Sequence, residues 1–151
     1  MVWELKQEAY DGPAAAALIS ALQAEFVVRY GQRDAAPVDP TEFAAPKGAF
    51  LVGYEDSMPV GCGGLRVVEP GLAEFKRIYV MRSRRRTGAA KRVLASLEET
   101  ARSMGCSRVR LLTGEEQPEA VALFESAAYR PIPAFGPYAE VPGSRFFGKA
   151  L

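Results

Sequence analysis

Three consecutive arginines followed by small residues form the stretch of this sequence with the clearest chemical potential. Arg84 to Arg86 precede Thr87 and Gly88, and residues 85–90 fit the pattern (Gln/Arg)-x-x-Gly-x-(Gly/Ala). Small residues at the fourth and sixth positions let a bulky anion approach the backbone where a Cβ would obstruct it. If a helix starts here, its unpaired N–H groups, its macrodipole and the arginines all favour phosphate. By itself the six-residue pattern is a weak signal, because arginine-rich turns are more often solvated loops.

The elements expected on either side of this turn strengthen the phosphate interpretation. Residues 74–81 are rich in β-branched and aromatic side chains, which predicts a strand. Residues 89–104 carry apolar side chains at the spacing of a one-sided helix. A strand that leads into a cationic turn and then a helix start is an arrangement suited to holding phosphate.

The chain contains no histidine, and this excludes several classes of catalytic site. Ser-His-Asp and Cys-His catalysis and the histidine-based zinc motifs all need that side chain. Cys62 and Cys106 cannot form a standard zinc site by themselves, so no metal is expected. General acid–base chemistry must therefore come from Glu, Asp, Tyr, Lys or a terminus. Two cysteines also fit free thiols in a cytoplasmic protein better than a disulfide scaffold.

Length and charge narrow the class of protein further. The 151 residues suffice for one domain with a substantial core, and 48% hydrophobic residues are typical of globular proteins. No apolar run approaches the roughly 20 residues that cross a bilayer, so no membrane partner is expected. The net charge of +1 argues against nucleic acid as a partner. A nucleic-acid-binding module that uses the arginine-rich turn is the alternative from another class.

The N-terminal half predicts antiparallel strands and one long helix. The helix begins at Pro13 and ends at Gly31, which is suited to a left-handed C-terminal cap. Residues 32–48 contain three prolines and are expected to be a loop with a short turn at 41–44. Gly61 to Gly64 lie inside a strand, where they indicate backbone clearance or a bulge. The expected strands are residues 2–7, 49–54 and 59–67, the last two as a hairpin.

The C-terminal half predicts a strand–helix–strand unit followed by a helix and two strands. A strand at 108–113 should run parallel to the strand at 74–81. The next helix opens at Gln117-Pro118 and runs to about residue 128. Two final strands, 129–132 and 145–151, flank a loop rich in proline and aromatic residues. The fold class is therefore α/β with a mixed sheet.

Three blocks of the sequence resemble the GNAT superfamily of N-acetyltransferases, in the form of its small bacterial single-domain members. AEFKRIYVMRSRRRTGAAKRVL is similar to the family's acetyl-coenzyme A signature. EEQPEAVALFESAAYRPI is similar to its later cofactor-side helix, and AFGPYAEVPGSRFFGKAL to its C-terminal strand. The resemblance implies a GNAT-like fold with a central β4-α3-β5 unit, in that family's element numbering, and a single acetyltransferase domain over residues 1–151.

The resemblance implies acetyl-coenzyme A as the co-substrate. The pantetheine arm would pair with a strand backbone, as in β-augmentation, and the pyrophosphate would be bound by N–H groups of residues 86–91. Basic side chains nearby would face the 3′-phosphate or solvent. The implied cofactor-binding residues are Ile78, Tyr79, Val80, Arg85, Arg86, Thr87, Gly88, Ala89, Ala90, Lys91, Gln117 and Phe124.

Glu74 is the residue that the resemblance implies as catalytic base. It lies eleven residues before Arg85, the register of the glutamate that acts as base in related histone acetyltransferases. An alkylammonium with a pKa of about 10.4 must lose a proton before its nitrogen can attack. A carboxylate can take that proton directly or through water. The alternative is that Glu74 forms an ion pair with Lys76 or another neighbour in the sheet.

The sequence departs from the family pattern at four positions. Phe124 stands where many members have the tyrosine thought to protonate the departing thiolate, and phenylalanine cannot do this. A thiol with a pKa of about 8.5 can still leave as a thiolate. Gln117 replaces the usual asparagine, while Ala128 and Arg86 each replace a glycine. These changes leave open a catalytically weak or inactive acetyl-coenzyme A-binding module as the alternative to an enzyme.

The acceptor is expected to be a small-molecule or peptide amine that attacks the thioester directly in a ternary complex. It should sit against the loops at 32–48 and 131–143. Asp34, Asp39 and Glu42 could favour a cationic amine or be ordinary surface acids. A homodimer through the hairpin or the last strand is also possible.

Overall fold

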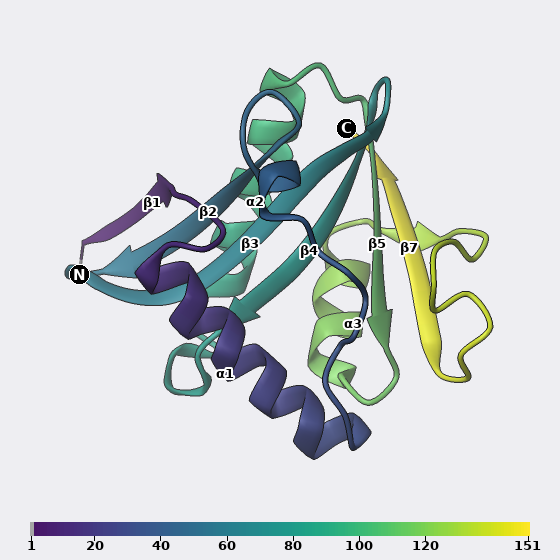
Figure 1. The fold of residues 1–151 in the computed structure, drawn as a ribbon, viewed down its shortest axis with the longest axis horizontal. Helices are drawn as coiled ribbons and strands as arrows, with labels where there is room; N and C mark the ends of the chain where they lie inside the picture. The colour runs from purple at the N-terminus through teal and green to yellow at the C-terminus, as the bar shows by residue number, and fades with distance from the viewer. Residues whose placement is uncertain (1) are drawn as a thin grey trace.

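A seven-stranded mixed sheet runs through the middle of the molecule in this computed structural model, which describes residues 2–151 (Figure 1). The strand order is β1-β2-β3-β4-β5-β7-β6. Neighbouring strands are antiparallel except for β4 and β5, which are parallel as expected. The strands are β1 (Trp3–Gln7), β2 (Gly48–Glu55), β3 (Met58–Glu69), β4 (Leu72–Val80), β5 (Arg108–Gly114), β6 (Arg130–Pro131) and β7 (Ser144–Ala150).

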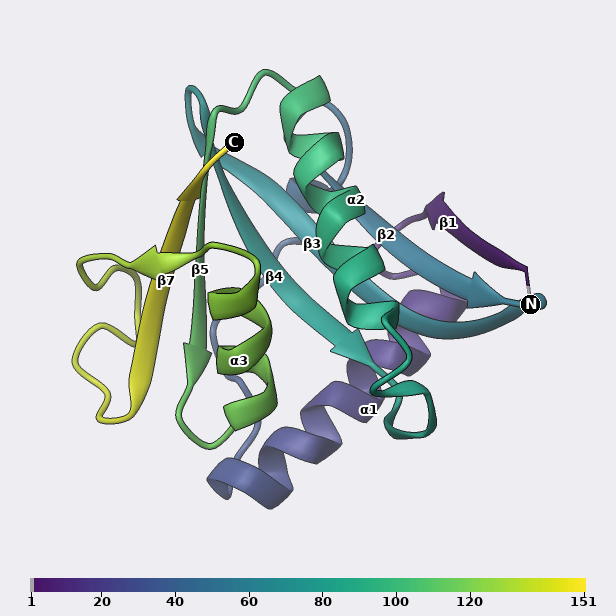
Figure 2. The ribbon, with the colours of Figure 1, turned by 180° about the vertical axis from the view of Figure 1, so that it is seen from behind.

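Helices cover both faces of this sheet. α1 (Pro13–Tyr30) crosses one face (Figure 1), while α2 (Ala89–Ser103) and α3 (Pro118–Ser126) lie on the other (Figure 2). The short 3-10 helices η1 (Pro40–Phe43) and η2 (Arg82–Arg84) lie in the connections. None of the helices in residues 2–151 is long and apolar enough to cross a membrane.

Each face of the sheet has its own hydrophobic core, and glycines in β3 let the helices approach. Val93, Leu97 and Ala101 of α2 are fully buried against the sheet. A Cβ on Gly63 would lie 2.7 Å from Leu97, and a Cβ on Gly64 would lie 2.7 Å from Phe43. These contacts confirm that the run of glycines in β3 provides backbone clearance.

The expected elements are all present, with shifted ends. The strand expected to start at residue 74 begins at Leu72. The last helix ends at Ser126 rather than near 128, because Ala128 takes a left-handed conformation with φ of +71°. The expected strand at 129–132 is reduced to β6, since proline at position 131 has no N–H to continue a ladder. Gly31 closes α1 in the left-handed conformation, as expected.

β4 and β5 pair over only four residues each, and this short pairing shapes the site. Leu72 to Phe75 pair with Arg108 to Leu111, and beyond these residues the two strands separate (Figure 2). The edge of β4 from Lys76 to Val80 therefore has no strand partner on the side of β5.

Candidate active site

A cleft of about 1640 Å³ opens where β4 and β5 separate. Its walls include β4 and β5, the start of α2, α3 and, on the other face of the sheet, α1 with the loops at 32–39 and 135–144. The cleft therefore reaches both faces of the sheet. This position, between the carboxyl ends of two parallel strands, is a common place for ligand sites in α/β proteins.

A bulge at Arg77 explains why β4 turns away from β5. Cys62 pairs with Tyr79 and Gly64 pairs with Lys76, so β4 has one more residue than β3 between these pairs. Arg77 takes a φ of +60°, and its buried guanidinium donates to Asp34 and to the Tyr10 hydroxyl. An extra residue bends its strand and increases the local twist. Sequence reasoning missed this feature because arginine gives no signal of a left-handed residue.

The start of α2 presents unpaired backbone donors to this cleft. Gly88 is the N-cap with φ of +88°, and no side chain caps the helix. The N–H of Arg92 makes the first helical hydrogen bond, to the Gly88 carbonyl at 3.1 Å. The N–H groups of Ala89, Ala90 and Lys91 consequently have no intrahelical acceptor. Gly88, Ala90 and Lys91 line the cleft, which gives it an anion-binding end.

The basic side chains near this helix start divide into paired and unpaired groups. Arg85 forms two hydrogen bonds with Glu25, at 2.8 and 2.6 Å, and a third with the Val80 carbonyl. Arg84 pairs with Glu55 at 2.6 Å. Arg86 and Lys91, which also line the cleft, form no ion pair within residues 2–151 and are the cations left for a bound phosphate.

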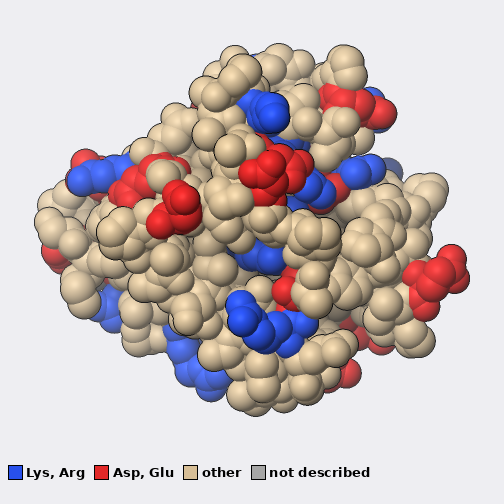
Figure 3. All heavy atoms as spheres, in the orientation of Figure 1, with Lys and Arg blue, Asp and Glu red and all other residues tan. Residues whose placement is uncertain are grey.

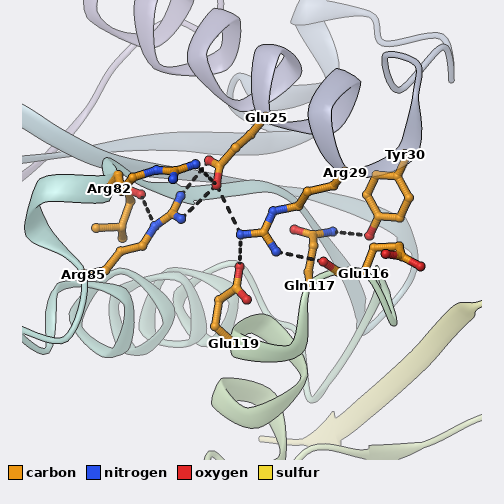
Figure 4. A network of polar contacts seen from close by, with 9 residues as sticks. Glu25, Arg29, Tyr30, Arg82, Arg85, Glu116, Gln117 and Glu119 are labelled. Carbon is orange, nitrogen blue, oxygen red and sulfur yellow. Dashed lines mark hydrogen bonds and ion pairs between the residues drawn. The ribbon is translucent and has the colours of Figure 1, made fainter.

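A chain of ion pairs joins the two sides of the cleft through α1 (Figure 4). Glu25 accepts from Arg85 of the cationic turn and from Arg29, and Arg29 also pairs with Glu119 of α3. The hydrogen bonds from Arg85, with the attraction of its charge and that of Arg29, hold the pKa of Glu25 below its ordinary value despite its burial. α1 is thus fixed to both walls of the cleft.

Most of the predicted cofactor-binding residues line the cleft, and two of them, Thr87 and Ala89, do not. The side chain of Thr87 turns away and donates to the Arg84 carbonyl at 2.6 Å, and Ala89 is buried under the helix start. Gln117 lines the cleft and donates to the Tyr30 hydroxyl at 2.8 Å. The other predicted residues on the wall are Ile78, Tyr79, Val80, Arg85, Arg86, Gly88, Ala90, Lys91 and Phe124.

Glu74 also lines the cleft, on the face that carries α1, and both its oxygens are engaged. Arg66 of β3 donates to one oxygen at 3.0 Å, and Arg110 of β5 donates to the other at 2.8 Å. The ion pair weighed as the alternative is therefore present, although its partners are these two arginines rather than Lys76. The role of Glu74 as a base stays a prediction.

The three acids expected near the acceptor are held by protein partners. Asp34 accepts from Arg77 and Tyr138, Asp39 caps η1 by accepting from the Thr41 N–H, and Glu42 pairs with Arg66. Burial raises the pKa of Asp34, but its hydrogen bonds and the charge of Arg77 outweigh this and lower the net pKa. These acids stabilise loops around the cleft and leave little free negative charge for a cationic amine.

The separated parallel strands, the uncapped helix start and the unpaired cations together define a protein that can hold a long ligand with phosphate at one end. The sequence model of the GNAT acetyltransferase family matches residues 15–129. A relative, the "IAA acetyltransferase" of Azospirillum brasilense, is 34% identical over 115 residues, which are 76% of this chain and 75% of that protein. The chain therefore belongs to the GNAT family and is an N-acetyltransferase.

Solved structures agree with this assignment. A Klebsiella pneumoniae protein assigned as an acyl-CoA N-acyltransferase superposes with a TM-score of 0.83 and 30% identity, over 99% of this chain and 98% of its own. The PaiA N-acetyltransferase of Thermoplasma acidophilum, solved in complex with coenzyme A, has a TM-score of 0.77 at 13% identity, with both chains fully covered. The latter similarity shows the shared fold. The GNAT resemblance read from the sequence is confirmed.

Proposed function

We propose that this protein transfers the acetyl group of acetyl-coenzyme A to a primary amine by direct attack in a ternary complex. The observation that carries the proposal is the uncapped start of α2, with its unpaired N–H groups, at the mouth of the cleft between β4 and β5. The coenzyme A bound by the PaiA relative supports the same co-substrate here.

The cleft offers a separate place for each part of acetyl-coenzyme A. N–H groups of residues 86–91, with Arg86 and Lys91, would bind the pyrophosphate. The unpaired edge of β4 at 78–80 would accept the pantetheine arm as an added strand. A backbone N–H near Val80 would stabilise the oxyanion as the amine attacks the thioester carbon. Phe124 forms an apolar wall and cannot protonate the sulfur, so coenzyme A would leave as a thiolate.

Thiol release from acetyl-coenzyme A tests this proposal directly. Purified protein is mixed with acetyl-coenzyme A and a panel of primary amines, and free thiol is measured with a chromogenic reagent. Both cysteines of the protein are buried, so its own thiols should add little background. We expect release that depends on the amine and a matching acetylated product by mass. Binding of coenzyme A without release for any amine would favour the inactive binding module.

A further inference from the structure

The wall of the cleft on the face that carries α1 contains a row of alternating acidic and basic side chains. Glu42 pairs with Arg66, Arg66 pairs with Glu74, and Glu74 pairs with Arg110, at 2.8 to 3.0 Å. Acidic and basic side chains meet in the middle of this face (Figure 3). The row contains two acids and two bases, so it neutralises itself and leaves no net charge.

Lys76 adds a positive charge beside this row, and no acid in residues 2–151 forms an ion pair with it. It follows Glu74 by two residues on β4, lines the same cleft and is half-buried. Within residues 2–151 its ammonium makes no hydrogen bond or ion pair, since the acids around it are held by arginines and Tyr138. Burial lowers the pKa of Lys76, and the charges of Arg77 and Arg66 act in the same direction, whereas those of Asp34 and Glu74 oppose it.

Arg110 supplies further donors beside this lysine. Its Nε donates to Glu74, while its terminal nitrogens have no acceptor in the part of the chain that the structure describes. The Cζ of the Arg110 guanidinium lies 4.1 Å from the centre of the Phe135 ring, a cation–π contact. The Nε of Arg66 is also buried without a partner. Arg110 and Lys76 lie on neighbouring strands about two residues apart in register, or roughly 7 Å along the sheet, so both long side chains can reach one anion.

We propose that the acceptor amine also carries a carboxylate, which Lys76 and Arg110 bind, so that the substrate class is an amino acid. This inference rests on the proposed acetyl transfer. A carboxylate would accept from the unmet donors of Lys76 and Arg110 and offset the positive charge of Lys76. The amine at the other end of the same molecule would then face the unpaired edge of β4 at 78–80. Lys76 would be a specificity-determining residue rather than part of the reacting group.

Pairs of substrates that differ only in the carboxylate test this inference. Each of glycine, β-alanine, 4-aminobutyrate and lysine is compared with its carboxamide, in the wild type, Lys76→Met and Lys76→Arg. The matched control is Lys47→Met, which changes an exposed lysine outside the cleft. We expect at least one acid to exceed its amide tenfold in kcat/KM. Lys76→Met should lower kcat/KM for the acid at least tenfold more than for the amide, mainly by raising KM. Lys76→Arg should keep most of the preference for the acid over the amide.

A binding measurement keeps the inference testable in the absence of turnover. The N-acetylated acids and amides are added to the protein with coenzyme A, and thermal stabilisation is recorded. We expect the N-acetylated acids, but not the N-acetylated amides, to raise the melting temperature. Lys76→Met should abolish this rise. Amides that react and bind as well as the acids would overturn the inference while leaving acetyl transfer intact. An absence of thiol release with all amines, together with acid-selective binding, would instead overturn the proposed transfer.

Discussion

Five residues other than glycine have a positive φ within residues 2–151, and two of them, Arg86 and Ala128, bear on the family pattern. Arg86, before the helix start of the cleft, has φ of +63°, and Ala128, between α3 and β6, has φ of +71°. Both stand where the family resemblance implies glycine. A Cβ in the left-handed region costs roughly 1 to 2 kcal/mol. Arginine and alanine therefore hold conformations suited to glycine at these two positions, at some cost in strain.

Ala128→Gly is expected to stabilise the protein by about 0.5 to 1 kcal/mol. Relief of the left-handed strain exceeds the added entropy of glycine in the unfolded chain. Ala127→Gly is the matched control, because Ala127 has φ of −94° and packs against the core, so the same change should destabilise. Urea unfolding measures both variants. Equal destabilisation by the two would show that Ala128 is unstrained.

Glu74→Gln is expected to lower kcat at pH 7 by about a hundredfold if Glu74 takes the proton from the amine. The deficit should shrink toward pH 10, because the amine then loses its proton without help. Affinity for coenzyme A should change little. Initial rates between pH 6 and 10 supply the measurement, with Glu99→Gln at an exposed ion pair as the control.

A different pH profile would assign Glu74 another role. The carboxylate holds Arg66 and Arg110 by hydrogen bonds, and its loss leaves two charges without their partner. A purely structural role predicts a lower melting temperature and a rate deficit that is the same at every pH. Unchanged rates at neutral pH would remove Glu74 from the reaction.

At the scale of elements, α1 is fixed to the cleft by charges rather than by packing alone. Glu25 of α1 accepts from Arg85, Arg82 lies 3.6 Å away, and Arg29 extends the chain to Glu119 of α3. The carboxylate of Glu25 is nearly buried, so these contacts are less screened than surface pairs. The charges should therefore determine how well α1 holds its place across the separated strands.

Glu25→Gln is expected to destabilise the protein by about 1 to 2 kcal/mol at pH 7, since it weakens hydrogen bonds between charged groups. The pKa of Glu25 is lowered in the folded state, so its contribution is present above its ordinary value of 4.5 and is lost as the pH falls below it. The wild type should lose stability in that range more steeply than the variant. Urea unfolding at a series of pH values measures this, and parallel curves would contradict it.

At the scale of the whole molecule, sequence patterns located the strands and the three α-helices and the parallel pairing of β4 with β5, but not the contacts that shape the cleft. Apolar spacing, Pro13 and Gly31 were sufficient to place the helices, because periodicity and caps are local signals. The cationic turn and the helix start were likewise predicted at the cleft. The residue types gave no sign of the bulge at Arg77, which separates β4 from β5.

The ion pairs around the cleft could not be predicted from the sequence for a related reason. Glu25 and Arg85 are 60 residues apart, and Gln117 and Tyr30 are 87 apart. Such pairs form only after the sheet has brought α1 and α3 together, and one sequence contains no signal of which acid meets which base. For the same reason the sequence left open whether Asp34 and Glu42 favour a cationic amine or are ordinary surface acids, and the structure engages both with distant arginines of the same chain.

Coenzyme A is expected to stabilise the whole molecule, because it joins the two walls of the cleft. A ligand at a hundred times its Kd contributes about 2.7 kcal/mol, which for a chain of this length corresponds to a rise in Tm of roughly 5 to 11 °C. Pantetheine, which lacks the pyrophosphate and the 3′-phosphate, should produce a much smaller rise if the helix start supplies most of the affinity. Differential scanning fluorimetry with both ligands measures this.

Gly88→Ala tests the helix start within the same experiment. Nothing of the protein lies within 4 Å of the added Cβ, so the substitution strains the backbone at φ of +88° and obstructs only a ligand. Gly105→Ala is the matched control, with φ of +84°, equal open space and a position at the far end of α2. Both should lose about 1 kcal/mol of stability, but only Gly88→Ala should raise the Kd for coenzyme A, by about tenfold, and so halve the rise in Tm. If coenzyme A raised the Tm of the two variants equally, its phosphates would bind elsewhere in the protein.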